Sequence, residues 1–178
     1  GIKQNAGAPA ILQTLAAPPG TLFGSFDRAQ AGSLRALIDA FNAGLTGLAK
    51  ESGSYILDVA ALAERIGTDA WFDPVQHFAY KLPFAAECAP AYADLLGRLM
   101  GAIRGKARKC LVLDLDNTLW GGVIGDDGVE GIVVGQGSAL GEAHLSIQDY
   151  AKTLRARGIM LAVSSKNEDT VARQPFRD

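Results

Sequence analysis

The periodicity of apolar residues divides this chain into helical and extended segments. Apolar side chains that recur every three or four residues predict amphipathic helices over residues 33–50, 59–66, 90–103 and 138–157. Short continuous apolar runs predict strands over residues 10–16, 55–57, 110–113 and 159–163. Because strands alternate with helices along the chain, the pattern predicts an α/β fold.

The helices carry their apolar residues as stripes, which we expect to be the faces turned toward the core. In the first long helix the stripe consists of Leu34, Leu37, Ile38, Phe41, Leu45 and Leu48. In the last one it consists of Leu140, Ala143, Ile147, Ala151 and Leu154. Asp58 is expected to cap the helix over 59–66, and Gly67 to end it in the left-handed conformation. His144 flanks the second stripe and is expected to be partly exposed.

A short basic segment, residues 104–109, interrupts this pattern and reads Arg-Gly-Lys-Ala-Arg-Lys. We interpret it as the connection between two regions, residues 1–104 and 105–178. Two uses of its charges stay open. The segment is either a solvated connector or a docking patch for an acidic partner.

Asp126-Asp127-Gly128 stands between short apolar runs. Asp-Gly in such a position is a strong hairpin signal, so we predict a β flap over residues 121–135. Asp126 and Asp127 are then turn residues rather than metal ligands.

Composition narrows the class of protein. The chain has 178 residues, of which 48% are hydrophobic and 20% charged, enough to bury a folded core. A net charge of −2 gives no case for nucleic-acid binding, and no run approaches the ~18 apolar residues of a membrane span. Two cysteines, Cys88 and Cys110, make no disulfide framework, and no signal peptide is visible. We therefore expect a cytoplasmic setting, with Cys110 as a buried and inert thiol.

Polar residues with chemical potential follow two of the predicted strands. Asp114 and Asp116 come directly after residues 110–113, and Thr118 follows two residues later. Ser165, with Ser164 as the alternative, follows residues 159–163. Strand, helix and strand in succession predict a parallel pair, so these side chains are expected at one edge of the sheet.

Two aspartates this close repel each other unless a cation lies between them. Oxygen ligands without neighbouring His or Cys favour Mg²⁺ over zinc. The sequence therefore predicts a magnesium site that uses the Asp114 carboxylate and the main-chain carbonyl of Asp116.

Asp114-Leu-Asp116-Asn-Thr118 resembles the first signature of the haloacid dehalogenase (HAD) superfamily, and Ser165 matches its second signature. The longer string Asp114-Leu-Asp-Asn-Thr-Leu-Trp-Gly-Gly122 is similar to the FkbH-like branch. The resemblance implies a HAD-like Rossmannoid parallel sheet and Mg²⁺-dependent phosphoryl transfer. It implies Asp114 as the nucleophile that forms an aspartyl-phosphate, and Asp116 as the general acid and base.

The same resemblance implies a phosphorylated small-molecule substrate. For the FkbH-like branch this is a phosphoglycerate, whose glyceryl unit passes to an acyl carrier protein in polyketide-type biosynthesis. The superfamily's downstream Lys and second acidic pair have no match before Asp178, because Lys166 adjoins the second signature. The HAD-like sheet is accordingly expected to be truncated in this chain.

Residues 1–104 resemble the C-terminal part of an SGNH-type α/β hydrolase. The string Asp73-Pro-Val-Gln-His77 is one residue longer than the Asp-x-x-His of such enzymes, and no nucleophilic Ser is matched. Asp73 and His77 are therefore expected in turn and packing roles, and Trp71, Phe72 and Phe78 in the core. The alternative to an enzyme is a non-catalytic HAD-like and SGNH-like scaffold that binds a carrier protein or an enzyme partner.

Overall fold

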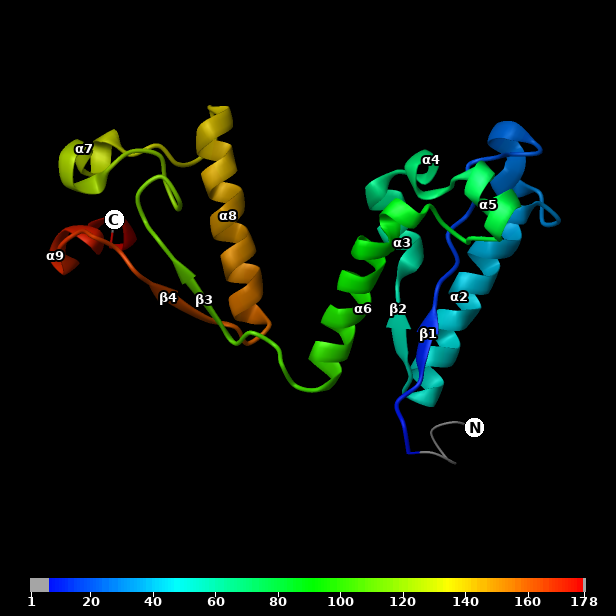
Figure 1. Ribbon diagram of the computed structural model, residues 1–178. Coiled ribbons are helices and arrows are strands. Elements are labelled where there is room, and N and C mark those ends of the chain that lie inside the picture. The colour runs from blue at the N-terminus through cyan, green and yellow to red at the C-terminus, as the bar shows by residue number, and fades with distance from the viewer. Residues whose placement is uncertain (1–6, 178) are drawn as a thin grey trace. The chain divides into compact units, whose positions relative to one another are not determined.

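The computed structural model describes residues 7–177 and divides the chain into two compact units (Figure 1). The first unit ends at Lys106 and the second begins at Ala107. In the described part of the chain each unit contains one pair of parallel strands. None of the helices in residues 7–177 combines the length and the apolar character needed to cross a lipid bilayer.

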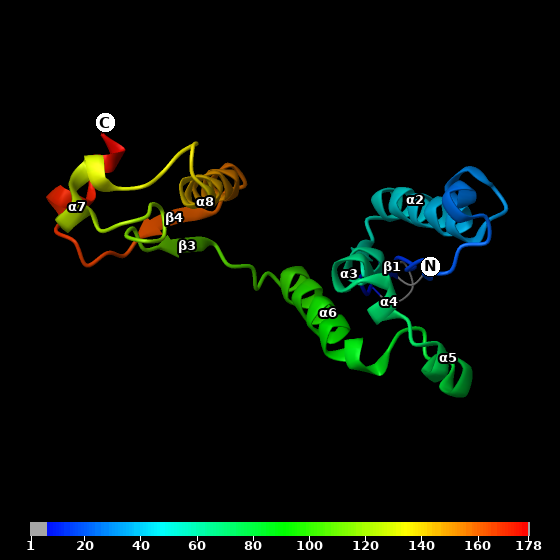
Figure 2. The same cartoon turned by 90° about the horizontal axis from the view of Figure 1, so that it is seen from above.

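The first unit is built on β1 (Ile11–Gln13) and β2 (Tyr55–Leu57), which pair in parallel with Ile11 opposite Tyr55. Between them the chain forms the 3-10 helix η1 (Gly24–Ala29) and the helix α2 (Leu34–Ser52). After β2 come α3 (Val59–Ile66), α4 (Thr68–Trp71), α5 (Pro74–Tyr80), η2 (Ala86–Cys88) and α6 (Ala89–Ile103). In both views α2 and α6 lie on opposite sides of the strand pair (Figures 1 and 2).

Side-chain caps explain where two of these helices begin. The hydroxyl of Ser33 accepts a hydrogen bond from the amide of Ala36 and so starts α2. The predicted cap of α3 is confirmed, because the carboxylate of Asp58 accepts from the amide of Ala61 at 3.2 Å. Gly67 does end α3 with a positive φ of 101°, but its ψ of 128° lies outside the expected left-handed helical region.

The core of the first unit lies between β2, α3 and α6. Its buried members are Leu57, Val59, Leu62, Ala63, Trp71, Ala85 and Cys88. Trp71 stacks at a tilt on Phe84, with ring centroids 4.7 Å apart. The expected core position of Trp71 is therefore confirmed, whereas Phe78 is 73% exposed and lies outside the core.

The apolar stripe of α2 is not covered as predicted. Leu34, Leu37, Phe41 and Leu48 are exposed, and the buried residue of the helix is Ala49. The strand pair is too short to cover this stripe, because α2 has 19 residues and β1 and β2 have three each.

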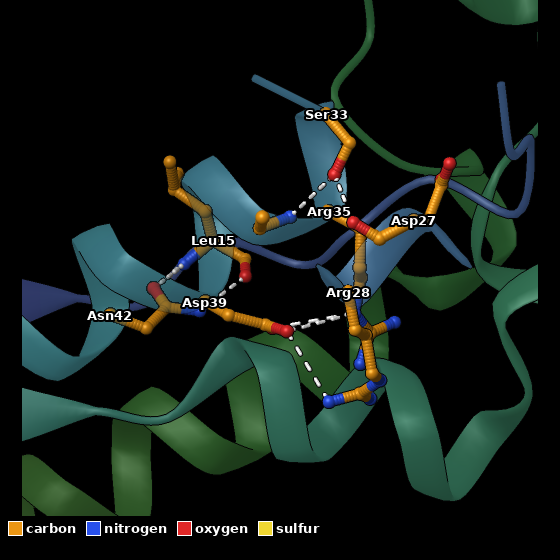
Figure 3. Close-up of polar contacts among 8 residues, drawn as sticks. Leu15, Asp27, Arg28, Ser33, Arg35, Asp39 and Asn42 are labelled. Atoms are coloured by element: carbon orange, nitrogen blue, oxygen red, sulfur yellow. Dashed lines mark hydrogen bonds and ion pairs between the residues drawn. The ribbon is translucent and has the colours of Figure 1, made fainter. Parts of the chain in front are cut away.

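Polar side chains tie α2 to the segments around it (Figure 3). The carboxylate of Asp39 accepts from Arg28 and Arg35, each at 3.3 Å. The amide of Asn42 bonds both main-chain groups of Leu15, each at 2.9 Å, just beyond the end of β1. Helix α2 is thus held to the strand end by hydrogen bonds.

The second unit is built on β3 (Cys110–Leu113) and β4 (Met160–Val163), which pair in parallel as predicted. Their connection contains α7 (Ile124–Gly131) and α8 (Ala139–Ala156), and β4 is followed by α9 (Asp169–Ala172) and η3 (Gln174–Phe176). Helix α8 lies alongside the strands in both views (Figures 1 and 2).

The strands of the second unit are more exposed than their apolar sequences predict. Exposed side chains on them include Cys110, Val112, Met160, Leu161 and Val163. Cys110 is therefore not the buried thiol that was expected. Two strands with one long helix beside them leave much of the sheet open. The core of this unit instead follows β3, where Leu115, Leu119, Trp120 and Ile124 are buried together.

The predicted β flap over residues 121–135 is wrong, because most of it forms α7. The carboxylate of Asp127, inside the helix, accepts from the amide of the preceding N-cap residue Val123 at 2.8 Å, which supports a helical turn. Gly128, with φ 66° and ψ 179°, then interrupts the helix. What remains of the flap is a pair of hydrogen bonds between Gly121 and Val133, at 2.8 and 2.9 Å.

Candidate active site at the ends of β3 and β4

The ends of β3 and β4 bring the predicted site residues to one edge of the strand pair. Leu113 and Val163 are paired at the last register position. The amide of Ser164 donates to the carbonyl of Leu113 at 2.9 Å, so the two chains leave the sheet side by side. Asp114 directly follows one strand, and Ser165 lies two residues beyond the other.

Asp114 is exposed, and its carboxylate accepts a hydrogen bond from the amide of the next residue, Leu115, at 2.8 Å. The chain then turns, because the amide of Leu119 donates to the carbonyl of Leu115 at 2.9 Å. Asn117 permits this turn in a left-handed conformation with φ 54°, and its side-chain oxygen accepts from the amide of Gly122 at 3.0 Å. The turn leaves the carboxylate of Asp114 accessible to a ligand.

Asp116 is held far more firmly than Asp114. Its Oδ1 atom accepts from the indole N–H of Trp120 and from the amide of Ile124, both at 3.1 Å. Its Oδ2 atom accepts from the side-chain amide of Asn167 at 2.7 Å. Three donors from three parts of the second unit therefore fix the orientation of this carboxylate.

These hydrogen bonds also set the charge of Asp116. Burial raises the pKa of the carboxyl group, but the bonds from Ile124, Asn167 and Trp120 outweigh burial and bring the pKa below its usual value. Asp116 is consequently ionised at neutral pH, the form that can accept a proton.

Thr118 and Ser165 lie close to the two aspartates in the fold but do not bond them. Within residues 7–177 the Thr118 hydroxyl has no hydrogen-bond partner, whereas its carbonyl accepts from α8. The hydroxyl of Ser165 accepts from the amide of Asn167 at 3.2 Å. Its own proton is thus available to a ligand.

Ser165 also lines an open cavity of about 730 Å³. The other lining residues are Leu115, Val163, Asn167, Asp169, Ala172, Arg173, Phe176 and Arg177. Asp169 and Arg173 form an ion pair with 2.8 Å contacts to both carboxylate oxygens. The cavity therefore joins an apolar wall to a charged rim beside the strand ends.

Several residues that shape the site had no assigned role in the sequence. Asn167 and Trp120 hold Asp116, and His144 and Gln148 of α8 bond the carbonyls of Thr118 and Leu119 at 2.9 and 2.8 Å. His144 was expected to be partly exposed, yet it is 7% exposed and faces the loop. In the sequence, the spacing of His144 and Gln148 by four residues already places both side chains on one face of the predicted helix.

The donor set at the strand end suits a hard cation. Asp114 has a carboxylate and Asp116 a main-chain carbonyl that could serve as oxygen ligands. In the described residues no group of three His, Cys, Asp or Glu side chains converges on one point. Two protein oxygens fit Mg²⁺ nonetheless, because this ion commonly keeps several waters and takes further ligands from a bound phosphate.

In the first unit, the side chains of Asp73 and His77, compared above with a hydrolase motif, contact main-chain atoms. Asp73 caps α5 by accepting from the amides of Val75 and Gln76, at 2.8 and 3.0 Å. The Nδ1 atom of His77 lies 3.0 Å from the carbonyl oxygen of Leu82. Asp73 thus has a local backbone role, whereas His77 is exposed and does not have the expected packing role.

Comparison with known proteins places this arrangement in context. No protein-family model and no curated protein matches the chain. Among solved structures, it matches the N-terminal part of the protein BF1531 from Bacteroides fragilis, a crystal structure that contains a phosphatase domain and is complexed with Mg. The TM-score is 0.88 at 32% sequence identity, over 97% of this chain and 46% of that one. The chain thus has the fold of this neighbour and spans less than half its length.

Proposed function

We propose that this chain carries the phosphoryl-transfer site of a Mg²⁺-dependent, HAD-type phosphatase that acts on a phosphorylated small molecule. The observation that carries the proposal is the placement of Asp114, Asp116 and Ser165 beyond neighbouring ends of parallel strands. The Mg-complexed phosphatase domain in the structurally similar protein supports the same chemistry.

In this proposal the carboxylate of Asp114 attacks phosphorus, forming a bond to one of its oxygens while the bond to the leaving oxygen breaks. Asp116 takes up a proton from solvent as the substrate binds and gives it to the leaving oxygen, which returns the side chain to the ionised form that its hydrogen bonds favour. Water then attacks the aspartyl-phosphate and gives its proton to Asp116, which releases phosphate and restores Asp114. The hydrogen bonds that favour ionised Asp116 favour its second role, as the base toward water.

Ser165 and the metal complete the proposed site. The Ser165 hydroxyl donates to a phosphoryl oxygen, for which its proton is available. Mg²⁺ held by the Asp114 carboxylate and the Asp116 carbonyl would supply positive charge for the phosphoryl oxygens.

Phosphate release with p-nitrophenyl phosphate and Mg²⁺ tests the function. Asp114→Asn preserves the shape of the side chain but removes the attacking charge, so phosphate release should vanish without unfolding. Asp116→Asn should slow turnover by roughly 10²- to 10⁴-fold. The matched control is Asp126→Asn, an exposed acid at the start of α7, which should leave the rate unchanged. Turnover of Asp114→Asn at the wild-type rate would instead favour the non-catalytic scaffold.

A narrower proposal concerns the substrate and rests on the Asp114–Gly122 string. We infer an FkbH-like role, in which a glyceryl unit from a phosphoglycerate passes to an acyl carrier protein. The partner would be acidic, and the basic residues of segment 104–109 would give it a docking surface. For the first unit we propose an SGNH-like origin without esterase activity, because Asp73 and His77 are engaged with the backbone.

A further inference from the structure

Helix α8 presents two polar side chains, one helical turn apart, to the loop between β3 and α7. The Nδ1 atom of His144 lies 2.9 Å from the carbonyl oxygen of Thr118, and Nε2 of Gln148 donates to the carbonyl of Leu119 at 2.8 Å. A carbonyl oxygen only accepts, so Nδ1 of His144 carries the proton in this contact. Consecutive carbonyls of the loop are thus held by residues at i and i+4 of one helix.

The packing around His144 shows how closely the loop approaches α8. The ring is 7% exposed. A Cβ atom added at Gly121 would lie 3.4 Å from Nε2 of His144 and 3.1 Å from the side chain of Leu140. The imidazole therefore bonds the Thr118 carbonyl and leaves little room for a side chain at Gly121.

This arrangement replaces the inward face that the apolar pattern predicts for α8. Of the predicted stripe, Leu140, Ala143 and Ile147 are exposed. The buried residues of α8 are Gly141, His144 and Ala151, of which Ala151 belongs to the predicted stripe, and the half-buried Gln148 continues their line at spacings of three and four. A helix that turns a His and a Gln inward does so because both find acceptors there.

The two bonded carbonyls, of Thr118 and Leu119, immediately precede Trp120, which contacts Asp116. Trp120 follows Leu119 in the chain, is 2% exposed, and donates its indole N–H to Oδ1 of Asp116 at 3.1 Å. Fixing the carbonyls of Thr118 and Leu119 fixes the backbone that aims this indole. The contact path therefore runs from α8 through Trp120 to the carboxylate.

We propose that His144 and Gln148 are positioning residues that set the orientation of Asp116 through Trp120. This inference rests on the proposed function insofar as Asp116 takes part in catalysis. Neither residue touches the reacting atoms, so each acts through the geometry of the loop.

Variants that remove one donor while keeping volume separate positioning from packing. His144→Phe keeps a ring but has no Nδ1–H, and Gln148→Met keeps a side chain of similar length but has no donor. His144→Asn restores a donor close to the position of Nδ1. Ser146→Ala, an exposed change on the same helix, is the matched control.

The first measurement does not depend on activity. The chain has two tryptophans, Trp71 and Trp120, so a ¹H–¹⁵N spectrum contains two indole N–H signals. His144→Phe and Gln148→Met should move the Trp120 signal toward the position it takes in Asp116→Ala and leave the Trp71 signal in place. His144→Asn and Ser146→Ala should keep the wild-type position. An unmoved Trp120 signal in folded Gln148→Met overturns the proposal, even if His144→Phe fails to fold.

The second measurement is the split between kcat and KM for phosphate release. Both donor-removing variants should lower kcat roughly 10- to 100-fold while changing KM much less, because misplacing a reacting group slows chemistry more than binding. His144→Asn should recover most of the loss. A moved Trp120 signal with unchanged kcat would overturn the link to catalysis. If the wild-type protein itself releases no phosphate, the proposed function fails, and the indole signal still decides whether α8 positions Asp116.

Discussion

The side-chain amide of Asn167 donates a 2.7 Å hydrogen bond to Oδ2 of Asp116, although the two residues are 51 positions apart in the chain. The bond joins the segment after β4 to the loop after β3. The main-chain amide of the same Asn167 donates to the Ser165 hydroxyl at 3.2 Å. One residue thus connects the two predicted halves of the site.

Replacing Asn167 should affect both stability and turnover. Asn167→Ala removes a hydrogen bond to an ionised, half-buried group, so the free energy of unfolding should fall by about 1–2 kcal/mol. Phosphate release should slow, because Asp116 loses one of its three donors. Urea unfolding and a phosphate assay check the two effects. Lys166→Ala, an exposed neighbour, is the control, and an equal loss in both variants would contradict a specific role for Asn167.

Gly141 in α8 should not tolerate a side chain. A Cβ atom there would lie 2.5 Å from the carbonyl oxygen of Gly135, a backbone atom that cannot rotate away. Gly141→Ala should therefore destabilise the second unit by roughly 1–3 kcal/mol in denaturant unfolding.

Gly97 in α6 provides the matched comparison. An added Cβ meets nothing within 4 Å, and the glycine is exposed. Gly97→Ala should stabilise the first unit by about 0.5–1 kcal/mol, since alanine favours the helix. A neutral result for Gly141→Ala would show that the Gly135 turn can shift.

The ion pair between Asp169 and Arg173 should make the C-terminal segment sensitive to acid. The hydrogen bond from Arg173 and the nearby positive charges lower the pKa of Asp169 below its usual value, against a smaller opposing effect of desolvation. The pair therefore contributes fully above the usual aspartate pKa, about 3.9. Its contribution falls as the pH drops through the lower pKa of the folded state.

The Nε–H signal of Arg173 in NMR spectra reports this titration. The signal should move as acid protonates Asp169, with a midpoint below that of an unpaired aspartate. Asp169→Asn should abolish the pH dependence. Because both side chains are well exposed, the effect on overall stability should be small.

The basic segment tests the proposed partner. If it binds an acidic carrier protein, changing Arg104, Lys106, Arg108 and Lys109 to Ala should weaken association and flatten its dependence on salt. Isothermal calorimetry at two salt concentrations measures both quantities. The control is the same number of charge changes at exposed positions outside the segment, at Arg98 in α6, Lys152 and Arg155 in α8, and Arg157 just after α8. If the variant with four changes in residues 104–109 binds the carrier protein with unchanged affinity, the segment is a solvated connector and not a docking patch.

Local sequence patterns predicted helices and strands correctly where contacts within one segment determine its structure. The apolar runs at Tyr55–Leu57 and Cys110–Leu113 form strands with the expected bounds, and Ser138 begins α8 because its hydroxyl accepts from Gly141. Asp127-Gly128 does not form the predicted hairpin, because Asp127 bonds the amide of Val123 at the start of α7.

Contacts between distant segments could not be predicted in the same way. Whether Asn167 reaches Asp116, or His144 turns toward Thr118, depends on how β4 and α8 pack against the loop. Burial failed for a related reason. The apolar stripe of α2 and the side chains of β3 and β4 would be covered in a wider sheet, but the two-stranded sheets of residues 7–177 leave them open.

The parallel pairing of β3 and β4 has a consequence for the order of folding. Closing a flexible loop of about 50 residues costs on the order of 3.5 kcal/mol in chain entropy, in addition to a constant term. Helix α8 lies inside that loop and forms from local contacts, so it should appear first and shorten the remaining search. Asp116 receives its bond from Asn167 only after the strands meet. In stopped-flow refolding, the burial of Trp120 should therefore lag behind the far-ultraviolet helix signal, and the candidate site should be among the last features of the second unit to form.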